Sequence, residues 1–173
     1  MLEAVIFVVF PFCMAFAAIS DTLSMTIANR ISAVLVLTFA AVAPLTGMDW
    51  ALYGWHFAAA GLVLAATFGL FVLGGMGGGD AKLLAATALW MGMTPSLVEY
   101  LIYTSIAGGV LTILIVMYRN SRFEVLSGHN MFLRHFANES KGVPYGIALG
   151  IGGMIAFSDS PLMQWALGKA VGQ

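Results

Sequence analysis

An aspartate at the end of a glycine run is the residue best suited to chemistry in this sequence. Five of the six residues at 74–79 are glycine, and they lead directly into Asp80, between two long apolar runs. An ionised carboxylate is costly at the edge of an apolar membrane segment, so its presence indicates a function. Glycine leaves the backbone bare and open to the approach of another chain. The stretch 74–84 is therefore interpreted as an active-site loop.

A second acid, Asp21, follows the first long apolar stretch. Hydrolysis of a peptide bond by aspartates needs two carboxylates about one water apart. One is ionised and takes a proton from the attacking water, while the other is protonated and donates to the carbonyl oxygen. Two carboxylates this close do not readily both ionise, so they share a proton and titrate as a unit. Asp21 and Asp80 are therefore the candidate catalytic pair.

The composition places these acids in a membrane protein. Of the 173 residues, 61% are hydrophobic and 9% are charged, and the mean hydropathy is +0.95, whereas soluble domains carry roughly 25% charged residues. A formal charge of −1 gives no reason to expect a nucleic-acid partner. Cys13 is the only cysteine, which excludes an internal disulfide and a cysteine-based zinc site.

Apolar runs separated by short polar turns predict an all-α, polytopic membrane protein with about six transmembrane helices, since one span needs about 20 mainly apolar residues. The fourth run is short for a free span, so we expect its neighbours to shelter it. The sixth is expected to break around 159–161. Gly142, Gly146 and Gly150, four residues apart, are interpreted as helix-packing positions. The predicted spans are 5–20, 31–46, 55–73, 81–93, 97–118 and 144–167.

The basic residues predict the orientation of these spans. With six spans and both termini outside, only Lys169 falls outside, and the other basic residues face the cytoplasm, as the positive-inside rule requires. This orientation places Asp21 and Asp80 on the cytoplasmic face and Asp49 and Asp159 on the opposite face. The basic residues on the cytoplasmic side are Arg30, Lys82, Arg119, Arg122, Arg134 and Lys141.

The residues around both acids resemble the motifs of type IV prepilin peptidases, which are membrane aspartyl proteases of the G-x-G-D class. Residues 77–84, Gly-Gly-Gly-Asp-Ala-Lys-Leu-Leu, match the G-x-G-D-x-K-L motif. Residues 21–29 resemble the D-x6-P-N pattern, with Ala28 in place of the proline, a change that removes no chemical group. Residues 143–146, Val-Pro-Tyr-Gly, resemble the P-Y-G element that opens the last helix. Together with the six-span plan, the resemblance covers nearly the whole chain.

The resemblance implies an endopeptidase that removes the short basic leader of prepilins on the cytoplasmic side. Asp21 and Asp80 would be the catalytic pair, with no metal and no other cofactor. The hydrophobic helix of the prepilin would pack against the spans, so prepilins and the lipid bilayer are the expected partners. Lys82 could add charge at the site, although contact with lipid phosphates is the preferred interpretation. The other residues expected to bind substrate or form the loop are Gly77, Gly78, Gly79, Asn29, Pro144 and Tyr145.

A chain that starts almost at its first span and lacks paired C-x-x-C motifs resembles the small peptidase-only form of tight-adherence (Flp-type) pilus systems. Methyltransferase activity is therefore not expected. The expected organisation is a single transmembrane peptidase domain, 1–173, in the bacterial inner membrane, with a cytoplasmic loop at 119–143. His129 and His135 in this loop are interpreted as part of an amphipathic segment on the lipid surface, since two histidines alone make a poor metal site. The oligomeric state is left open.

Three alternatives use the same residues. An archaeal-type preflagellin peptidase would have the same chemistry. A small proton- or ion-coupled transporter subunit could use Asp21 and Asp80 as ion sites, although such transporters show internal repeats and helices broken at the bilayer midplane. Acids at helix ends can also be simple caps or solvated groups, and the glycines a simple turn. The acid pair, the glycine run and the three motifs together favour the peptidase.

Overall fold

The computed structural model describes residues 1–119 and 143–172. Within these residues the chain forms helices and no strand, which confirms the all-α prediction. The interior of the predicted loop, with His129 and His135, lies outside the described residues. The helices are α1 (Leu2–Ser24), α2 (Asn29–Leu45), α3 (Trp50–Val72), α4 (Gly78–Met91), α5 (Pro95–Arg119), α8 (Tyr145–Phe157) and α9 (Pro161–Ala170).

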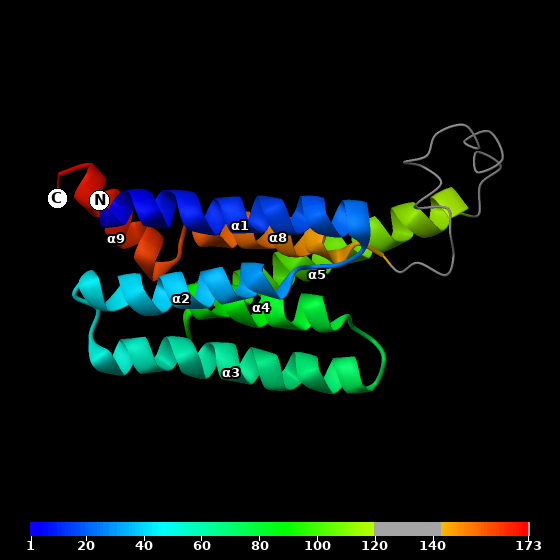
Figure 1. Ribbon diagram of the computed structural model, residues 1–173, viewed down its shortest axis with the longest axis horizontal. Helices are drawn as coiled ribbons and strands as arrows, with labels where there is room; N and C mark the ends of the chain where they lie inside the picture. The colour runs from blue at the N-terminus through cyan, green and yellow to red at the C-terminus, as the bar shows by residue number, and fades with distance from the viewer. Residues whose placement is uncertain (120–142, 173) are drawn as a thin grey trace.

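The helices lie side by side in one elongated bundle (Figure 1). α1 and α8 pack together along one side, α3 lies along the other, and α2 and α4 lie between them. The α1–α2 and α3–α4 connections and the start of α8 are at one end of the bundle. We call this the aspartate end, because it contains Asp21 and Asp80. The α2–α3 and α4–α5 connections and α9 are at the opposite end.

Three helices are long and apolar enough to cross a membrane, namely α1, α3 and α5. α8 and α9 meet at a break with a bend of 51°. If the two together form one span, four candidate spans are present among the described residues. α2 has 17 residues and α4 has 14, so both are shorter than a free span needs. All six apolar runs thus coincide with helices, and these long apolar helices are typical of a membrane protein. The total of about six spans stays a prediction.

The short helix α4 lies at the centre of the bundle. Its residues 83–91 are all buried, and it contacts α2, α3, α5 and α8. A helix that is apolar around its whole circumference is typical of such a position. The expectation that this short run is sheltered by its neighbours is therefore confirmed.

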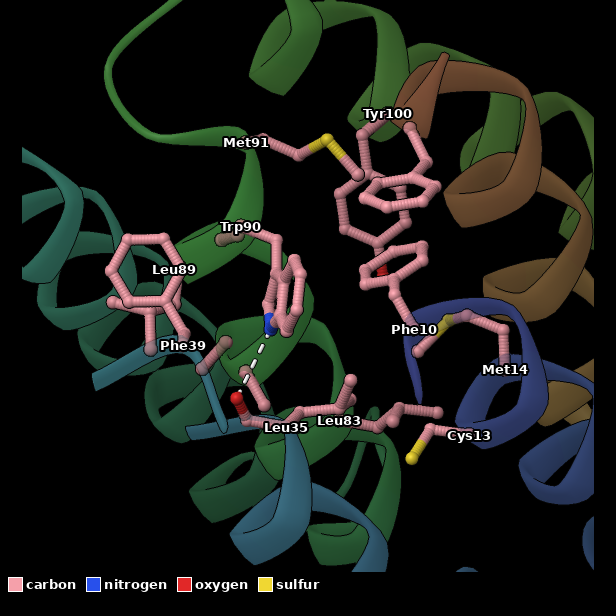
Figure 2. Close-up of a cluster of buried hydrophobic side chains, with 14 of the residues drawn as sticks. Phe10, Cys13, Met14, Leu35, Phe39, Leu83, Leu89, Trp90, Met91 and Tyr100 are labelled. Carbon is pink, nitrogen blue, oxygen red and sulfur yellow. Dashed lines mark hydrogen bonds between the residues drawn. The ribbon is translucent and has the colours of Figure 1, made fainter. Parts of the chain in front are cut away.

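Two polar contacts fix the position of α4 along its own axis. Figure 2 shows the Trp90 indole among side chains from neighbouring helices, with Nε1 donating to the Leu35 carbonyl of α2 at 3.1 Å. On another side, the buried His56 of α3 donates from Nδ1 to the Leu89 carbonyl at 2.7 Å. Leu89 lies in the last turn of α4, where carbonyls lack an intrahelical partner. Both contacts hold the helix that carries Asp80 at its first turn.

The first and third helices extend beyond the predicted spans. α1 continues through Ser24, so Asp21 lies inside its last turns. The expectation that Asp21 follows the first span is therefore corrected. The hydroxyls of Thr22 and Ser24 bond back to the carbonyls of the preceding turn, at 2.6 and 2.7 Å, so both polar side chains are satisfied within the helix. α3 begins at Trp50, because the Asp49 carboxylate caps its first turn by accepting from the N–H groups of residues 51 and 52.

The break in the last helix confirms the expectation for 159–161. α8 ends at Phe157, and Ser160 is the N-cap of α9, with its hydroxyl accepting from the Met163 N–H. Pro161 follows at the first helical position, where its missing N–H leaves no hydrogen bond unmade.

Candidate active site

Three segments that are far apart in the sequence meet at the aspartate end: the end of α1, the start of α4 and the start of α8 (Figure 1). Asp21 comes from the first segment and Asp80 from the second. The P-Y-G residues Pro144, Tyr145 and Gly146 come from the third. Antiparallel packing of the helices thus brings together the three motifs that the sequence contains.

Asp21 is held by the first turn of α8. Its side chain is 5% exposed, and Oδ2 accepts a hydrogen bond from the Gly146 backbone N–H at 2.7 Å. Gly146 is the second residue of α8, so its N–H is one of the donors that a helix leaves without an intrahelical partner. The helix dipole also favours a negative group at this position.

Gly146 must be glycine for this contact to form. A Cβ atom at this residue would lie 2.7 Å from the Asp21 Cβ and 3.0 Å from its Oδ2. It would also lie 3.1 Å from the Ala17 carbonyl oxygen, on the same face of α1. A side chain here would therefore push α1 and its carboxylate away from the start of α8.

Asp80 lies in the first turn of α4 and is partly exposed. It is the third helical residue, and its side chain reaches back to the backbone of Gly77, the N-cap, as an acid in a capping box does. The Asp80 carboxylate is also close enough to that of Asp21 to interact with it electrostatically. The structure therefore brings the two predicted acids together.

The loop is shorter than the glycine run. Gly78 and Gly79 already belong to α4, so they do not form the loop, in contrast to our expectation. Gly79 instead allows the α1–α2 connection to approach, because a Cβ here would lie 3.2 Å from the Ile27 Cβ and 3.3 Å from its carbonyl oxygen. Gly77 is exposed and ends the loop as the N-cap of α4.

Two other predicted residues, Asn29 and Lys82, contact each other. The Lys82 ammonium donates to the Asn29 Oδ1 at 2.9 Å and joins the start of α2 to the start of α4. Lys82 lies two residues after Asp80, which places the two side chains on nearly opposite sides of the helix. Lys82 is therefore at the aspartate end without facing the acid pair.

Pro144 and Tyr145 shape the start of α8. Pro144 is buried and is the N-cap residue of the helix. The Tyr145 hydroxyl lies 3.2 Å from the Thr112 hydroxyl of α5, and its ring packs against Gly108 of the same helix. Both residues place the α8 N-terminus against α1 and α5, and through it the Gly146 donor against Asp21.

Sequence reasoning missed the role of Gly146. It was interpreted as a helix-packing position and as part of the P-Y-G element, although its N–H also donates to Asp21. The donor belongs to the backbone, so no side chain could have indicated it.

The arrangement of the two acids suits general acid–base chemistry. Two carboxylates at one end of an apolar bundle, one buried and one partly exposed, are groups that can serve as a general acid and a general base. The described residues contain no group of three or more His, Cys, Asp or Glu side chains that could hold a metal ion.

Comparison with known proteins identifies the family. A family model, the type IV leader peptidase family, matches residues 8–113, which include Asp21 and Asp80 but end before the P-Y-G segment. Neither the curated proteins nor the solved structures gave a match. The matched residues make up more than half of the chain, and they contain both acids that the bundle brings together. The chain therefore belongs to the type IV leader peptidase family and is a peptidase.

Proposed function

We propose that this protein removes the leader peptide of type IV prepilins of the Flp type, at the cytoplasmic face of a bacterial inner membrane. The observation that carries the proposal is the meeting of Asp21 and Asp80 at one end of the bundle, close enough to interact electrostatically. The family match supports a peptidase over an ion-coupled transporter. The basic residues of the described helices support the cytoplasmic assignment, because Arg30, Lys82 and Arg119 all lie toward the aspartate end.

In the proposed mechanism, the two carboxylates share one proton and hold the attacking water between them. The ionised carboxylate takes a proton from the water as it attacks the scissile carbonyl, and the protonated one donates to the carbonyl oxygen. The Gly146 N–H keeps the Asp21 side chain in place during both steps. No metal or other cofactor takes part in this scheme.

The substrate would approach along the exposed part of the glycine loop. Gly74, Gly75 and Gly77 are exposed, so an extended backbone can come close to the main chain at these three positions before the start of α4. The prepilin helix would continue into the bilayer beside the apolar outer faces of the bundle. An archaeal-type preflagellin would be cut by the same chemistry, and the choice between the two substrates is part of the test.

Replacement of each acid by asparagine tests this mechanism directly. We expect Asp21→Asn and Asp80→Asn each to leave a co-expressed Flp-type prepilin uncut, because asparagine keeps the shape of the side chain but cannot act as a base or share a proton. Asp159→Asn is the matched control, since Asp159 is exposed at the opposite end of the bundle. Leader removal is measured as a gel shift, at equal amounts of each variant in the membrane.

The outcomes separate the two parts of the proposal. Wild-type cleavage with two inactive variants and an active control supports the acid pair. Near wild-type cleavage by either variant contradicts the two-acid mechanism. If the wild type leaves Flp-type prepilins intact but cuts a preflagellin, the substrate assignment is wrong and the chemistry stands.

A further inference from the structure

A groove between α2 and α3, with α4 as its floor, is not used by the proposed reaction. It has a volume of about 590 Å³ and is lined almost entirely by apolar atoms. α2 and α3 each pack closely on α4 but barely contact one another, which leaves the groove between them. Small residues make up much of its wall and floor, namely Ala33, Ala60, Gly61, Ala85 and Ala86. Lys82 lies on the other side of α4 from Asp80, so the groove is separate from the acid pair.

The polar groups of this groove are collected at its aspartate end. Lys82 lines it there, and its ammonium contacts the neutral Asn29 amide; the described residues give it no carboxylate partner. Ser32 lies one turn further along α2 from Asn29 and is 8% exposed. Ser32 lines the same groove, and its hydroxyl is buried and has no hydrogen-bond partner among the described residues. A buried hydroxyl without a partner needs an explanation, and a bound ligand or water is one.

We propose that this groove binds one anionic phospholipid. The lipid phosphate would contact the Lys82 ammonium, the Ser32 hydroxyl would turn toward the groove and donate to an ester carbonyl, and an acyl chain would lie over Ala85, Ala86 and Leu89. The order of groups along the groove, first a cation, then a hydroxyl and then an apolar wall, matches the order of groups along a phospholipid. Lys82 lies at the bundle end that is expected to face the cytoplasmic leaflet, where basic residues attract anionic lipids.

Binding there would support the helix that carries Asp80. α4 is too short to cross the bilayer as a free helix, and its only exposed residue after Asp80 is Lys82. A lipid between α2 and α3 would fill this gap in the apolar surroundings of α4. The Lys82 ammonium would also gain a charge-assisted hydrogen bond to the lipid phosphate in place of contacts with water.

The test measures lipid binding alone and uses the full chain purified in detergent. Native mass spectrometry would follow the retention of added phosphatidylglycerol and phosphatidylcholine. We expect the wild type to retain one phosphatidylglycerol about tenfold more tightly than phosphatidylcholine, and Lys82→Gln to remove this preference. Lys169→Gln is the matched control, because it removes one exposed charge at the opposite end of the bundle. No substrate is needed, so failure here is distinguishable from failure of the peptidase proposal.

A second pair of variants tests the apolar part of the groove. Gly61 lines it, and a Cβ there would meet open space, so Gly61→Leu should fold and fill the groove. We expect it to weaken the retention of both lipids at least about fivefold. Gly69→Leu is the control, since Gly69 lies on the same helix, also has open space around it and does not line the groove.

Three results would overturn the lipid site. The first is a preference for phosphatidylglycerol that survives Lys82→Gln. The second is displacement of the lipid by inorganic phosphate at equal concentration, which would mean that the acyl chain adds nothing. The third is loss of leader cleavage in Gly61→Leu with unchanged lipid retention, which would assign the groove to the helix of the prepilin.

Discussion

At the scale of single residues, the decisive contact is the hydrogen bond between the Gly146 N–H and the Asp21 carboxylate. It joins the P-Y-G segment to the first acid across 125 residues of sequence. The donor belongs to the backbone, so no side chain in the sequence identifies it. The requirement for glycine comes from the close approach of α1 to α8, which a Cβ atom would prevent.

We expect Gly146→Ala to lower leader cleavage by about tenfold to a hundredfold, because a hydrogen bond to a charged group contributes about 1.5–3 kcal/mol. The added Cβ would displace Asp21 from the donor. Cleavage rates in matched membrane preparations provide the measurement. Gly109→Ala is the control, since a Cβ at Gly109 of α5 meets nothing within 4 Å.

A further variant separates misplacement of the carboxylate from a general loss of helix packing. Gly150 lies one turn further along the same α1–α8 contact, where a Cβ would lie 3.3 Å from the Ala18 Cβ. If Gly150→Ala reduces cleavage as strongly as Gly146→Ala, then close helix packing explains the effect and the donor contact does not.

At the scale of elements, α4 determines where Asp80 lies. Its axial position is fixed near its C-terminus, by Trp90 and His56, more than two turns away from the acid. Its N-terminus is fixed by contact of Gly79 with Ile27 and by the hydrogen bond from Lys82 to Asn29. Substitutions that remove the contacts at the C-terminal end of α4 should therefore destabilise the packing of the whole helix.

We expect Trp90→Phe to lower the thermal unfolding temperature in detergent by roughly 5 °C or more. It removes the second hydrogen bond to the Leu35 carbonyl, which contributes about 0.5–1.5 kcal/mol, and it also leaves a gap in the core. Trp50→Phe is the matched control, because it is the same substitution at a residue that is 73% exposed and lies outside the core. Equal unfolding temperatures for the two variants would show that the indole contact does not hold α4.

At the scale of the whole molecule, the bundle has two chemically different ends. One contains both acids, the glycine loop and the start of α8, while the other contains the turns that follow α2 and α4 together with α9 (Figure 1). If the chain crosses the membrane as the basic residues predict, α3 has its first residue outside and its last residue at the cytoplasmic face.

Cysteine labelling at the two ends of α3 tests this orientation. In a Cys13→Ala background, we expect a membrane-impermeant maleimide to label Trp50→Cys in intact spheroplasts and to label Leu73→Cys only after permeabilisation. Trp50 and Leu73 are 73% and 84% exposed, so both thiols would be accessible to reagent on their own side. Labelling of Leu73→Cys alone in intact spheroplasts would reverse the proposed orientation of the active site.

The sequence by itself determined the helical class, the approximate place of each helix, the shelter of α4 and the break near Pro161. These features follow from local hydrophobicity, chain length and helix-capping residues, which act over a few neighbouring positions. The sequence also indicated Asp21 and Asp80 as candidate catalytic residues, because an acid beside an apolar run is unusual. It placed the end of α1 too early, because the polar residues Thr22 and Ser24 end the apolar run but not the helix, in which their hydroxyls bond to carbonyls of the preceding turn.

Only the tertiary structure decided how these residues act on one another. It brought Asp21 to the Gly146 N–H, moved Gly78 and Gly79 from the loop into α4, and paired Lys82 with Asn29 of α2. These arrangements depend on how closely antiparallel helices approach and on which way each helix is rotated about its axis. Both are set by contacts between distant segments, which no local pattern of residues records.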